Sequence, residues 1–392
     1  MKILHTADWH LGRTLAGRDL LPDQEFALMQ LINIARDERV DAIVIAGDVY
    51  DRAQPPDKAV KLFGEVLTQL QAIGRVLCIA GNHDSGGRIS FASELLAKSG
   101  VHMAGNELGA PIHVDVTSKM CTTDSVRFHL MPYATPEEVR SVIGEEAIRT
   151  HSDAIKARVA MCNLAKDGPN VLVGHLFAQG CHPSDSERDI AVGGIPQVDM
   201  SLFSQFAYTA LGHLHQPHDV PKAEGTTGHA RYSGSICRYS FSEENHDKGV
   251  TIVTIDREGC VSTQHLQLKP KMGMRTIRGA FGAIISAANL EDPHSREFVL
   301  VRIELTDSTL INDAHSRLRA LYPHMLESAY VCTAASVGSD RISEEQLRDG
   351  KPIENFKLFF TESGAHLSDV QKTSVMNAAT DCMQIADQGD QT

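Results

Sequence analysis

Short apolar segments of this chain end repeatedly in aspartate, asparagine or histidine. Residues 76–80 are apolar and run into Gly81-Asn82-His83-Asp84. Similar segments end at Asp8 and His10, at Asp48, at His175, and at His213 and His215. In open α/β folds, ligands bind at the edge formed by the carboxyl ends of the strands. The sequence therefore predicts that these polar side chains meet at one edge of a sheet.

Together the segment ends supply seven nitrogen and oxygen donors: Asp8, His10, Asp48, Asn82, His175, His213 and His215. A single zinc ion needs only three or four ligands, so this number indicates two metal ions. Carboxylate, amide and imidazole donors together suit manganese or iron, and suit magnesium less well. If one carboxylate bridges the ions, they can lie ~3.5–4 Å apart, the spacing of two-metal phosphoester hydrolysis.

His83 is the one histidine of these motifs that the ligand set leaves over. It is therefore available to donate a proton to a leaving oxygen. Either Asp51 or Asp84 could orient its ring. Each motif alone has an ordinary explanation, since G-D often forms a turn and G-H a core histidine. Their occurrence in order at successive strand ends predicts one catalytic centre.

The elements that must position these residues follow from the apolar spacing. Helices are expected at residues 24–39, 57–72, 90–98, 135–143 and 151–166, with Asp23 as the N-cap of the first. Strands alternate with them up to residue 175. From residue 206 the pattern is mostly β, with strands expected at 208–211, 229–232, 249–256 and 262–267. We therefore predict an α/β (α+β) fold in which a two-sheet β-sandwich is flanked by helices.

Lys269-Pro270-Lys271 marks the expected end of the first domain. We expect a catalytic domain at 1–270, a small α/β capping domain at 271–340 and a helical C-terminal segment at 341–392. The last segment is acidic but carries too many apolar residues to be solvated along its whole length. It either folds back on the body as a pair of helices or docks another chain, and the sequence leaves both open.

The amino-acid composition and the net charge limit the classes of protein to which this chain can belong. Hydrophobic residues make up 42% and charged residues 22% of the 392 residues, as in ordinary globular proteins. No apolar run is long enough for a membrane span, and Asp8 interrupts any signal-peptide core. The 8 cysteines form no C-x-x-C pair, which indicates reduced thiols and a cytoplasmic location. The net charge of −13 argues against binding nucleic acid by bulk positive charge alone, although another protein chain could supply a basic groove.

The set of motifs resembles the calcineurin-like metallophosphoesterase superfamily over residues 1 to about 270. That resemblance implies two metal sites, one held by Asp8, His10, Asp48 and His215, and the other by Asp48, Asn82, His175 and His213. It implies that Asp48 bridges the ions and that His83 is the catalytic histidine. Residues 48–52 also look like the phosphatase form of the second motif, which favours Asp51 as the partner of His83.

The chain further resembles the SbcD family of nucleases over nearly its whole length. The segments that carry the likeness are residues 1–13, 47–51 with Pro55-Pro56, 81–85, 208–215, 231–235 with 240–243, and 352–383. The resemblance implies a manganese-dependent 3′→5′ double-strand DNA exonuclease that is also a single-strand and hairpin endonuclease. It implies work in DNA repair, recombination and replication with an SbcC-type ABC ATPase. The expected assembly is a homodimer within a heterotetramer, in the cytoplasm at the nucleoid.

Two other functions compete with this one. The same core could act on a small phosphodiester or a phosphoprotein, or the chain could be an inactive scaffold. The capping domain and the apolar C-terminal segment favour the DNA nuclease, and the complete ligand set with His83 disfavours the scaffold. Arg13, Arg18 and Arg88 lie near the motif loops and are either phosphate contacts or ordinary surface residues.

Overall fold

The computed structural model describes residues 1–331 except 122–123, 182–185, 188–197 and 222–227. The chain divides into compact units at Met1–Tyr330 and Val331–Thr392. The expected helices and docking role of residues 341–392 lie outside the described residues and stay predictions. Among the described residues, no helix is long and apolar enough to cross a membrane.

The first β-sheet has the strand order β14-β13-β1-β4-β5-β6. Its strands are β1 (Lys2–Thr6), β4 (Ala42–Ala46), β5 (Arg75–Ile79), β6 (Val101–Ala104), β13 (Gly249–Ile255) and β14 (Val261–Gln267). Strands β1, β4, β5 and β6 pair in parallel, whereas β13 and β14 join antiparallel. Every residue of β4 is buried, as expected for a continuous apolar run that is covered on both faces.

The second β-sheet has the order β11-β12-β10-β9-β8-β7. Its strands are β7 (Ile112–Thr117), β8 (Ser125–Met131), β9 (Asn170–His175), β10 (Tyr208–Gly212), β11 (His218–Asp219) and β12 (His229–Tyr232). The two sheets pack face to face, because Val44 and Ile3 of the first share one buried cluster with Phe128 and Tyr208 of the second. The predicted two-sheet fold is therefore confirmed.

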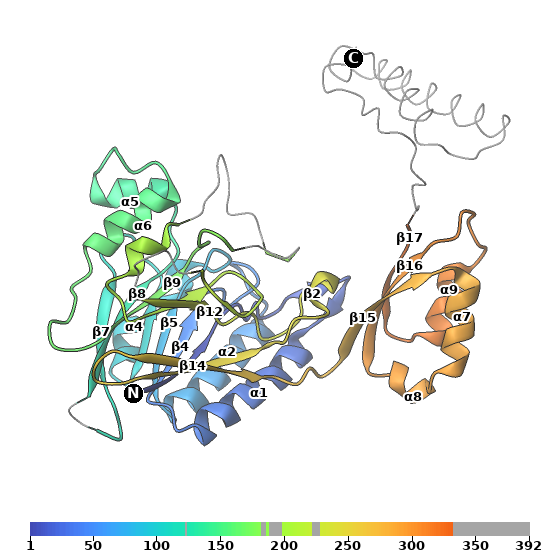
Figure 1. The fold of residues 1–392 in the computed structure, drawn as a ribbon, viewed down its shortest axis with the longest axis horizontal. Coiled ribbons are helices and arrows are strands. Elements are labelled where there is room, and N and C mark those ends of the chain that lie inside the picture. The colour runs from blue at the N-terminus through green and yellow to red at the C-terminus, as the bar shows by residue number, and fades with distance from the viewer. Residues whose placement is uncertain (122–123, 182–185, 188–197, 222–227, 332–392) are drawn as a thin grey trace, which may run out of the picture. The chain divides into compact units, whose positions relative to one another are not determined.

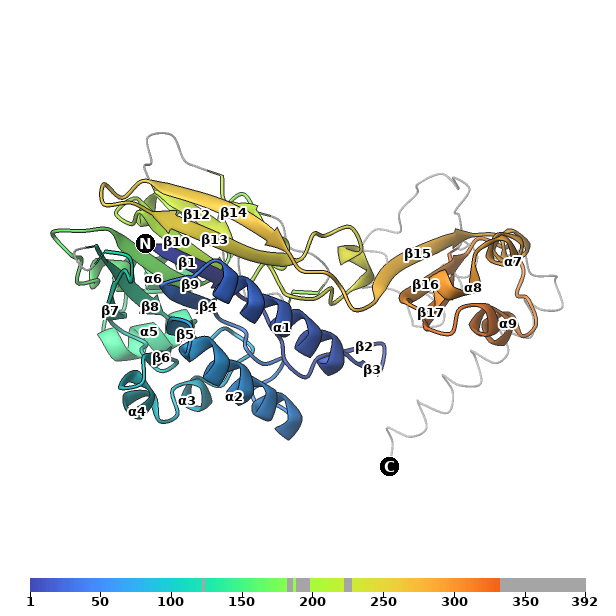
Figure 2. The same cartoon turned by 90° about the horizontal axis from the view of Figure 1, so that it is seen from below.

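Helices cover the outer faces of both sheets (Figures 1 and 2). Helices α1 (Leu21–Asp37) and α2 (Asp57–Gln71) lie side by side against the first sheet, where Leu28 and Val66 pack with Ile43. Helix α6 (His151–Ala160) packs Ile155 against Leu172 of the second sheet, near η1 (Met200–Phe203). Helix α5 (Pro136–Ile143) joins α6, and a capping box begins each of them.

Local differences from the expected helices have simple causes. Within the range 90–98 expected to be helical, only α4 (Ser93–Ala97) is a helix, because Ala92 directly before it has a left-handed backbone with φ 55°. A separate short helix, α3 (Gly86–Ile89), precedes the expected range. The prediction of Asp23 as an N-cap is wrong. Helix α1 begins at Leu21, ahead of a proline that favours the first turn, and Asp23 forms an ion pair of 3.0 Å with Arg18 instead.

Residues 273–330 form a small parallel sheet with its own core. Strands β15 (Gly273–Gly279), β16 (Val299–Leu305) and β17 (Met325–Tyr330) are flanked by α7 (Phe281–Leu290), α8 (Pro293–Arg296) and α9 (Ala314–Leu321). Phe281, Ile303 and Leu318 share the buried cluster of this unit. A second cluster joins Leu300 of β16 to Phe241 of η2 (Phe241–Glu243) and to Leu15 of the hairpin β2 (Thr14–Leu15) and β3 (Arg18–Asp19). This apolar contact connects the small unit to the two-sheet body.

Candidate metal centre

The predicted ligands come together where strands of both sheets end. Asp8 and His10 follow β1, Asp48 follows β4, Asn82 and His83 follow β5, His175 ends β9, and His213 and His215 follow β10. Apart from Asn82, which is half-buried, all of these side chains are buried. The edge that the sequence predicts for the site is thus shared by two packed sheets.

Backbone strain is concentrated at the same residues. Asp8, His10, Asp48 and His213 have φ angles of 53°, 43°, 50° and 111°. Residues other than glycine adopt such angles at a cost, and functional sites are where that cost is most often found. Gly47 (φ 91°) is required beside them, because a Cβ there would lie 2.4 Å from Nδ1 of His175. The tight turns after the strands let the polar side chains approach one another.

Asp48 is at the centre of the cluster. Its Oδ2 lies 3.6 Å from Nε2 of His10, 3.4 Å from Nε2 of His175 and 3.9 Å from Nε2 of His83. Its Oδ1 accepts a hydrogen bond of 2.9 Å from the backbone N–H of His83, which fixes the carboxylate. This position suits a ligand shared by two cations.

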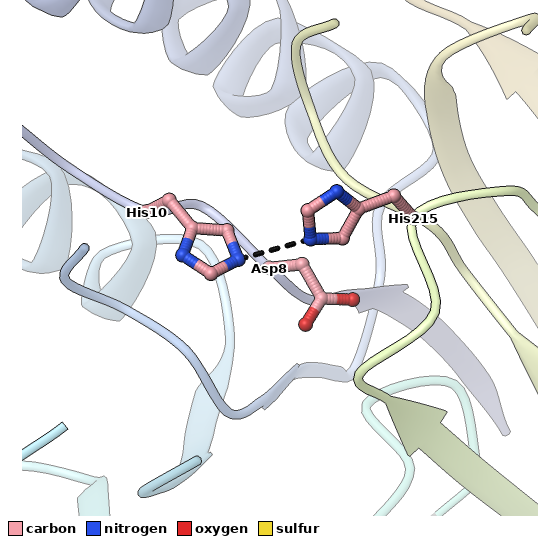
Figure 3. A group of neighbouring side chains, drawn as sticks. All are labelled: Asp8, His10 and His215. Atoms are coloured by element: carbon pink, nitrogen blue, oxygen red, sulfur yellow. Dashed lines mark hydrogen bonds between the residues drawn. The ribbon is translucent and has the colours of Figure 1, made fainter. Parts of the chain in front are cut away.

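Asp8, His10 and His215 form one potential cation site (Figure 3). The Nε2 atoms of His10 and His215 lie 3.0 Å apart. The Asp8 carboxylate is held by the backbone N–H of His213, which donates to its Oδ1 at 2.9 Å. Facing imidazole nitrogens need a shared proton or a shared cation, so this group fits a cation.

Asp8, Asp48 and His175 form a second potential cation site, and His10, Asp48 and His83 form a third. Nδ1 of His175 donates to the carbonyl oxygen of Ala46 at 2.9 Å, which directs Nε2 toward Oδ1 of Asn82, also at 2.9 Å. The ring of His213 lies 5.5 Å from the ring of His175. All seven predicted donors thus surround the same region.

The electrostatics of the cluster also fit a cation. Burial raises the pKa of Asp8 to about 7, against the opposing effect of His175. Burial disfavours charge on His175, but the Asp48 carboxylate outweighs it and raises the pKa of His175 to about 9. Burial lowers the pKa of His10 and of His213 well below the usual range. In the protein without metal ions, bound protons therefore offset the negative charge of the buried carboxylates. Divalent cations can take the place of these protons.

The spacing and the types of the donor atoms also fit a cation. In each potential group the ligand atoms lie within 4.8 Å of one another. Within the described residues, Nδ1 of His10 is buried and has no hydrogen-bond partner. Imidazole nitrogens with carboxylate and amide oxygens fit manganese, iron or magnesium better than a soft metal.

His83 contacts Asp51 through the backbone. Nδ1 of His83 donates to the carbonyl oxygen of Asp51 at 2.7 Å. The Asp51 carboxylate lies instead 3.8 Å from Nδ1 of His10 and 3.6 Å from Nη1 of Arg13. The main chain of Asp51 therefore accepts the hydrogen bond of His83, and its carboxylate lies near His10.

Asp84, the other carboxylate considered for His83, connects two turns. It accepts hydrogen bonds from the backbone N–H groups of Val49, Tyr50 and Gly81 at 3.1, 2.9 and 2.9 Å. Burial raises its pKa to about 7. These bonds tie the turn after β4 to the turn after β5, so Asp84 supports the geometry of both.

Sequence reasoning missed a carboxylate behind His215. Oε1 of Glu243 lies 3.1 Å from Nδ1 of His215, and the Ser186 hydroxyl donates to the same oxygen. Lys248 forms an ion pair of 2.6 Å with Glu243. Burial opposes its ionisation, but Lys248 and His215 hold the pKa of Glu243 well below its usual range. The one signal for it in the sequence is that residues 240–243 belong to the segments that resemble the SbcD family.

The three arginines differ in their surroundings. Nη2 of Arg13 donates to the carbonyl oxygen of Ser186 at 3.0 Å, and its guanidinium lies 5.1 Å from the ring centre of Tyr239. Arg13 therefore lies beside the cluster. Arg18 is paired with Asp23, and Arg88 is part of α3.

The fold and the site are those of a metallophosphoesterase, and comparison with known proteins agrees. A sequence profile of the calcineurin-like phosphoesterase family matches residues 1–217. A profile described as the type 5 capsule protein repressor C-terminal domain matches residues 270–363.

Curated relatives match almost the whole chain. The SbcD subunit of the SbcCD nuclease of Staphylococcus epidermidis is 32% identical over 379 residues, which cover 96% of this chain and 97% of that protein. The SbcD subunit of the Staphylococcus saprophyticus nuclease is 32% identical over 388 residues, with 97% and 98% covered. The chain therefore belongs to the calcineurin-like phosphoesterase family and, within it, to the SbcD family. The predicted family and the predicted class of enzyme, a metal-dependent phosphoester hydrolase, are confirmed.

Among solved structures, a dimetal phosphatase from Danio rerio is 11% identical, with a TM-score of 0.38 and with 69% of this chain and 99% of that chain covered. A likeness at that score supports no conclusion about function.

Proposed function

We propose that this chain is a two-metal DNA nuclease that cuts duplex ends 3′→5′ and also cuts single strands and hairpins. The observation that carries the proposal is the position of Asp48, whose Oδ2 lies within 3.4–3.9 Å of His175, His10 and His83. A central carboxylate between two groups of donors is what a bridged pair of cations requires. The relatives named as parts of a nuclease supply the substrate class.

The metal ligands are assigned as the resemblance to the metallophosphoesterases implies. Asp8, His10, Asp48 and His215 would hold one ion, and Asp48, Asn82, His175 and His213 the other. The donor set favours Mn²⁺, with Mg²⁺ as the weaker alternative. When bound, the ions would supply a hydroxide nucleophile at neutral pH and offset phosphate charge.

The residues of the chain have separable tasks in this reaction. Because a carbonyl oxygen can only accept, Nδ1 of His83 carries a hydrogen that it donates to Asp51. Nε2 of His83 therefore faces the site and is the atom that passes a proton to the leaving oxygen. The Asp48 carboxylate lies 3.9 Å from that atom.

The partners in this proposal are DNA and an SbcC-type ABC ATPase, in a heterotetramer that contains a homodimer of this chain. The net charge of −13 makes unaided binding of duplex DNA unfavourable, so the ATPase would supply most of the basic surface. We place the complex in the cytoplasm at the nucleoid, and residues 341–392 are the segment proposed to dock the ATPase. Light scattering of the complex would test this stoichiometry.

The decisive experiment is cleavage of end-labelled duplex DNA in Mn²⁺, by the chain alone and with its co-expressed ATPase, with and without ATP. Stepwise shortening from 3′ ends that needs the ATPase and ATP supports the proposal. The His83→Gln protein is the control, because it should retain the metal ligands and lose the proton donor.

A small chromogenic phosphodiester provides the contrasting substrate. Its hydrolysis without any cutting of DNA, in the presence of the ATPase, would replace the proposal with a phosphoesterase for small substrates or phosphoproteins. Failure to cleave either substrate with metal bound would indicate a binding role.

A further inference from the structure

A buried ion pair lies behind His215, at the ring edge opposite the metal centre. Oε1 of Glu243 lies 3.1 Å from Nδ1 of His215, and Oε2 lies 2.6 Å from Nζ of Lys248. Glu243 is 0% exposed and Lys248 is 5% exposed. A buried ion pair is costly to desolvate, so its presence needs a local reason.

Hydrogen bonds with neighbouring groups hold the pair in place. Lys248 also donates to the carbonyl oxygen of His215 and to Oγ of Ser235, both at 2.8 Å. The backbone N–H of Tyr239 donates to Oε2 of Glu243 at 3.1 Å. Lys248 thus holds the main chain of His215 directly and its ring through Glu243.

This arrangement selects one form of the imidazole. Oγ of Ser186 also lies 2.7 Å from Nδ1 of His215, and this hydroxyl donates its own hydrogen to Oε1 of Glu243, so it can accept from the ring. An ionised carboxylate only accepts hydrogen bonds, so the hydrogen of a neutral His215 ring belongs on Nδ1. The lone pair is then on Nε2, the nitrogen that lies 3.0 Å from Nε2 of His10. A metal ligand needs its lone pair on that side, and a carboxylate behind a ligating histidine commonly secures it.

We propose that Glu243, with Lys248 as its counter-ion, is a positioning residue that holds His215 in the Nδ1–H form with Nε2 directed at the metal centre. The inference rests on the proposed function for the identity of the site as a metal centre. Glu243 acts through His215 and does not contact substrate. Loss of Glu243 should therefore weaken metal binding by His215 and leave the proton transfer by His83 unchanged.

The neighbouring residue gives a matched control. Glu244 accepts a hydrogen bond of 2.6 Å from the backbone N–H of Thr276 in β15. It follows η2 directly after Glu243 but contacts the small unit instead of His215. A Glu244→Gln variant therefore tests the effect of altering this segment without altering the support of His215.

The test uses ¹⁵N-histidine NMR of the metal-free protein and Mn²⁺ titration of the same samples. His215→Gln assigns the His215 signals. Wild type should show Nδ1 protonated and Nε2 unprotonated. Glu243→Met with Lys248→Met, which replaces the buried pair by apolar side chains of similar size, should lose this preference and bind Mn²⁺ about 10- to 100-fold more weakly. Glu243→Gln keeps the shape and should weaken binding less, and Glu244→Gln should match wild type.

The outcomes separate the two proposals. A wild-type His215 with its hydrogen on Nε2, or Mn²⁺ affinity unchanged in both Glu243 variants, would overturn the positioning role. Equal weakening in Glu244→Gln would also overturn it, because the effect would then belong to the segment as a whole. If wild type shows the Nδ1–H form but binds no Mn²⁺, the proposed function fails while the selection of the tautomer stands.

Discussion

Nδ1 of His83 donates a hydrogen bond of 2.7 Å to the backbone carbonyl oxygen of Asp51. The side chain of Asp51 points to other groups, 3.8 Å from His10 and 3.6 Å from Arg13. Because a side-chain substitution leaves the carbonyl in place, Asp51→Asn should lower the cleavage rate less than tenfold. Steady-state cleavage of DNA by the complex would measure this. A loss as large as that of a His83 variant would show that the carboxylate itself orients the ring.

Replacement of His83 should separate chemistry from metal binding. A positioned general acid contributes about 10²- to 10⁴-fold to a rate, so His83→Gln should lose at least a hundredfold in cleavage. None of the assigned metal ligands is changed, and Mn²⁺ occupancy measured by elemental analysis should remain that of wild type. Loss of the metal in this variant would show that His83 is a ligand and would contradict its assigned role.

Metal binding should stabilise the fold through Asp48. A ligand that binds only the folded state at 100 times its Kd raises the free energy of unfolding by about 2.7 kcal/mol. Mn²⁺ at that concentration should raise the Tm of wild type, and EDTA should reverse the shift. Asp48→Asn removes the carboxylate between both donor groups, so its Tm should not respond. An equal Mn²⁺ shift in the variant would place the stabilising ion elsewhere.

The clustering of the candidate site residues could be predicted from the sequence for a physical reason. Strand β4 and residues 76–79 of β5 are continuous buried apolar runs, and such a run in a parallel sheet shows where its strand ends. The polar residue that follows such a strand must then lie at the edge of the sheet. For this reason the residues Asp48 and His83 could be placed in one cluster before their distances were known.

What sequence reasoning missed are contacts that bring distant residues together. Glu243 lies 28 residues after His215 in the sequence, and no local spacing encodes their contact. The Asp51 contact with His83 was expected from the side chain, but a main-chain acceptor leaves no trace in residue type. The break at Ala92 was missed for a similar reason, since the left-handed turn carries no glycine.

His5 should make stability depend on pH. It is buried between the Tyr208 hydroxyl at 2.9 Å and the carbonyl oxygen of Leu211 at 3.2 Å, and burial, followed by the charge of Arg231, lowers its pKa from 6.5 to about 3. Between pH 3 and pH 6.5, His5 therefore binds a proton in the unfolded chain but stays neutral in the folded chain. The stabilisation is complete above pH 6.5 and is lost as the pH falls toward 3, by about 2 kcal/mol at pH 5.

Urea unfolding at pH 8 and pH 5 would measure this loss, and His5→Gln isolates it. The glutamine amide can bond both neighbours but does not titrate, so the variant should lose about 2 kcal/mol less than wild type between the two pH values. Equal losses in both proteins would assign the pH dependence to the other buried histidines.

Arg158 should be a major contributor to stability on the outer face of the second sheet. Its guanidinium is 0% exposed and donates to the carbonyl oxygens of Glu107, Pro132 and Gly109 at 2.6, 2.7 and 3.2 Å. Arg158→Met would leave one buried and two partly buried acceptors without their donor, at a cost of about 3–5 kcal/mol in the free energy of unfolding for the three bonds together.

The effect should also extend toward the metal centre. Pro132 precedes Tyr133, whose backbone N–H donates to the carbonyl oxygen of Ala80 at 2.9 Å, just ahead of Asn82. Weaker Mn²⁺ binding should therefore accompany the lower stability of Arg158→Met, measured by urea unfolding and by titration. Lys156→Ala on the exposed side of α6 is the control and should change stability by less than about 0.5 kcal/mol. A loss below about 1 kcal/mol in Arg158→Met would mean that water replaces the guanidinium at these carbonyls.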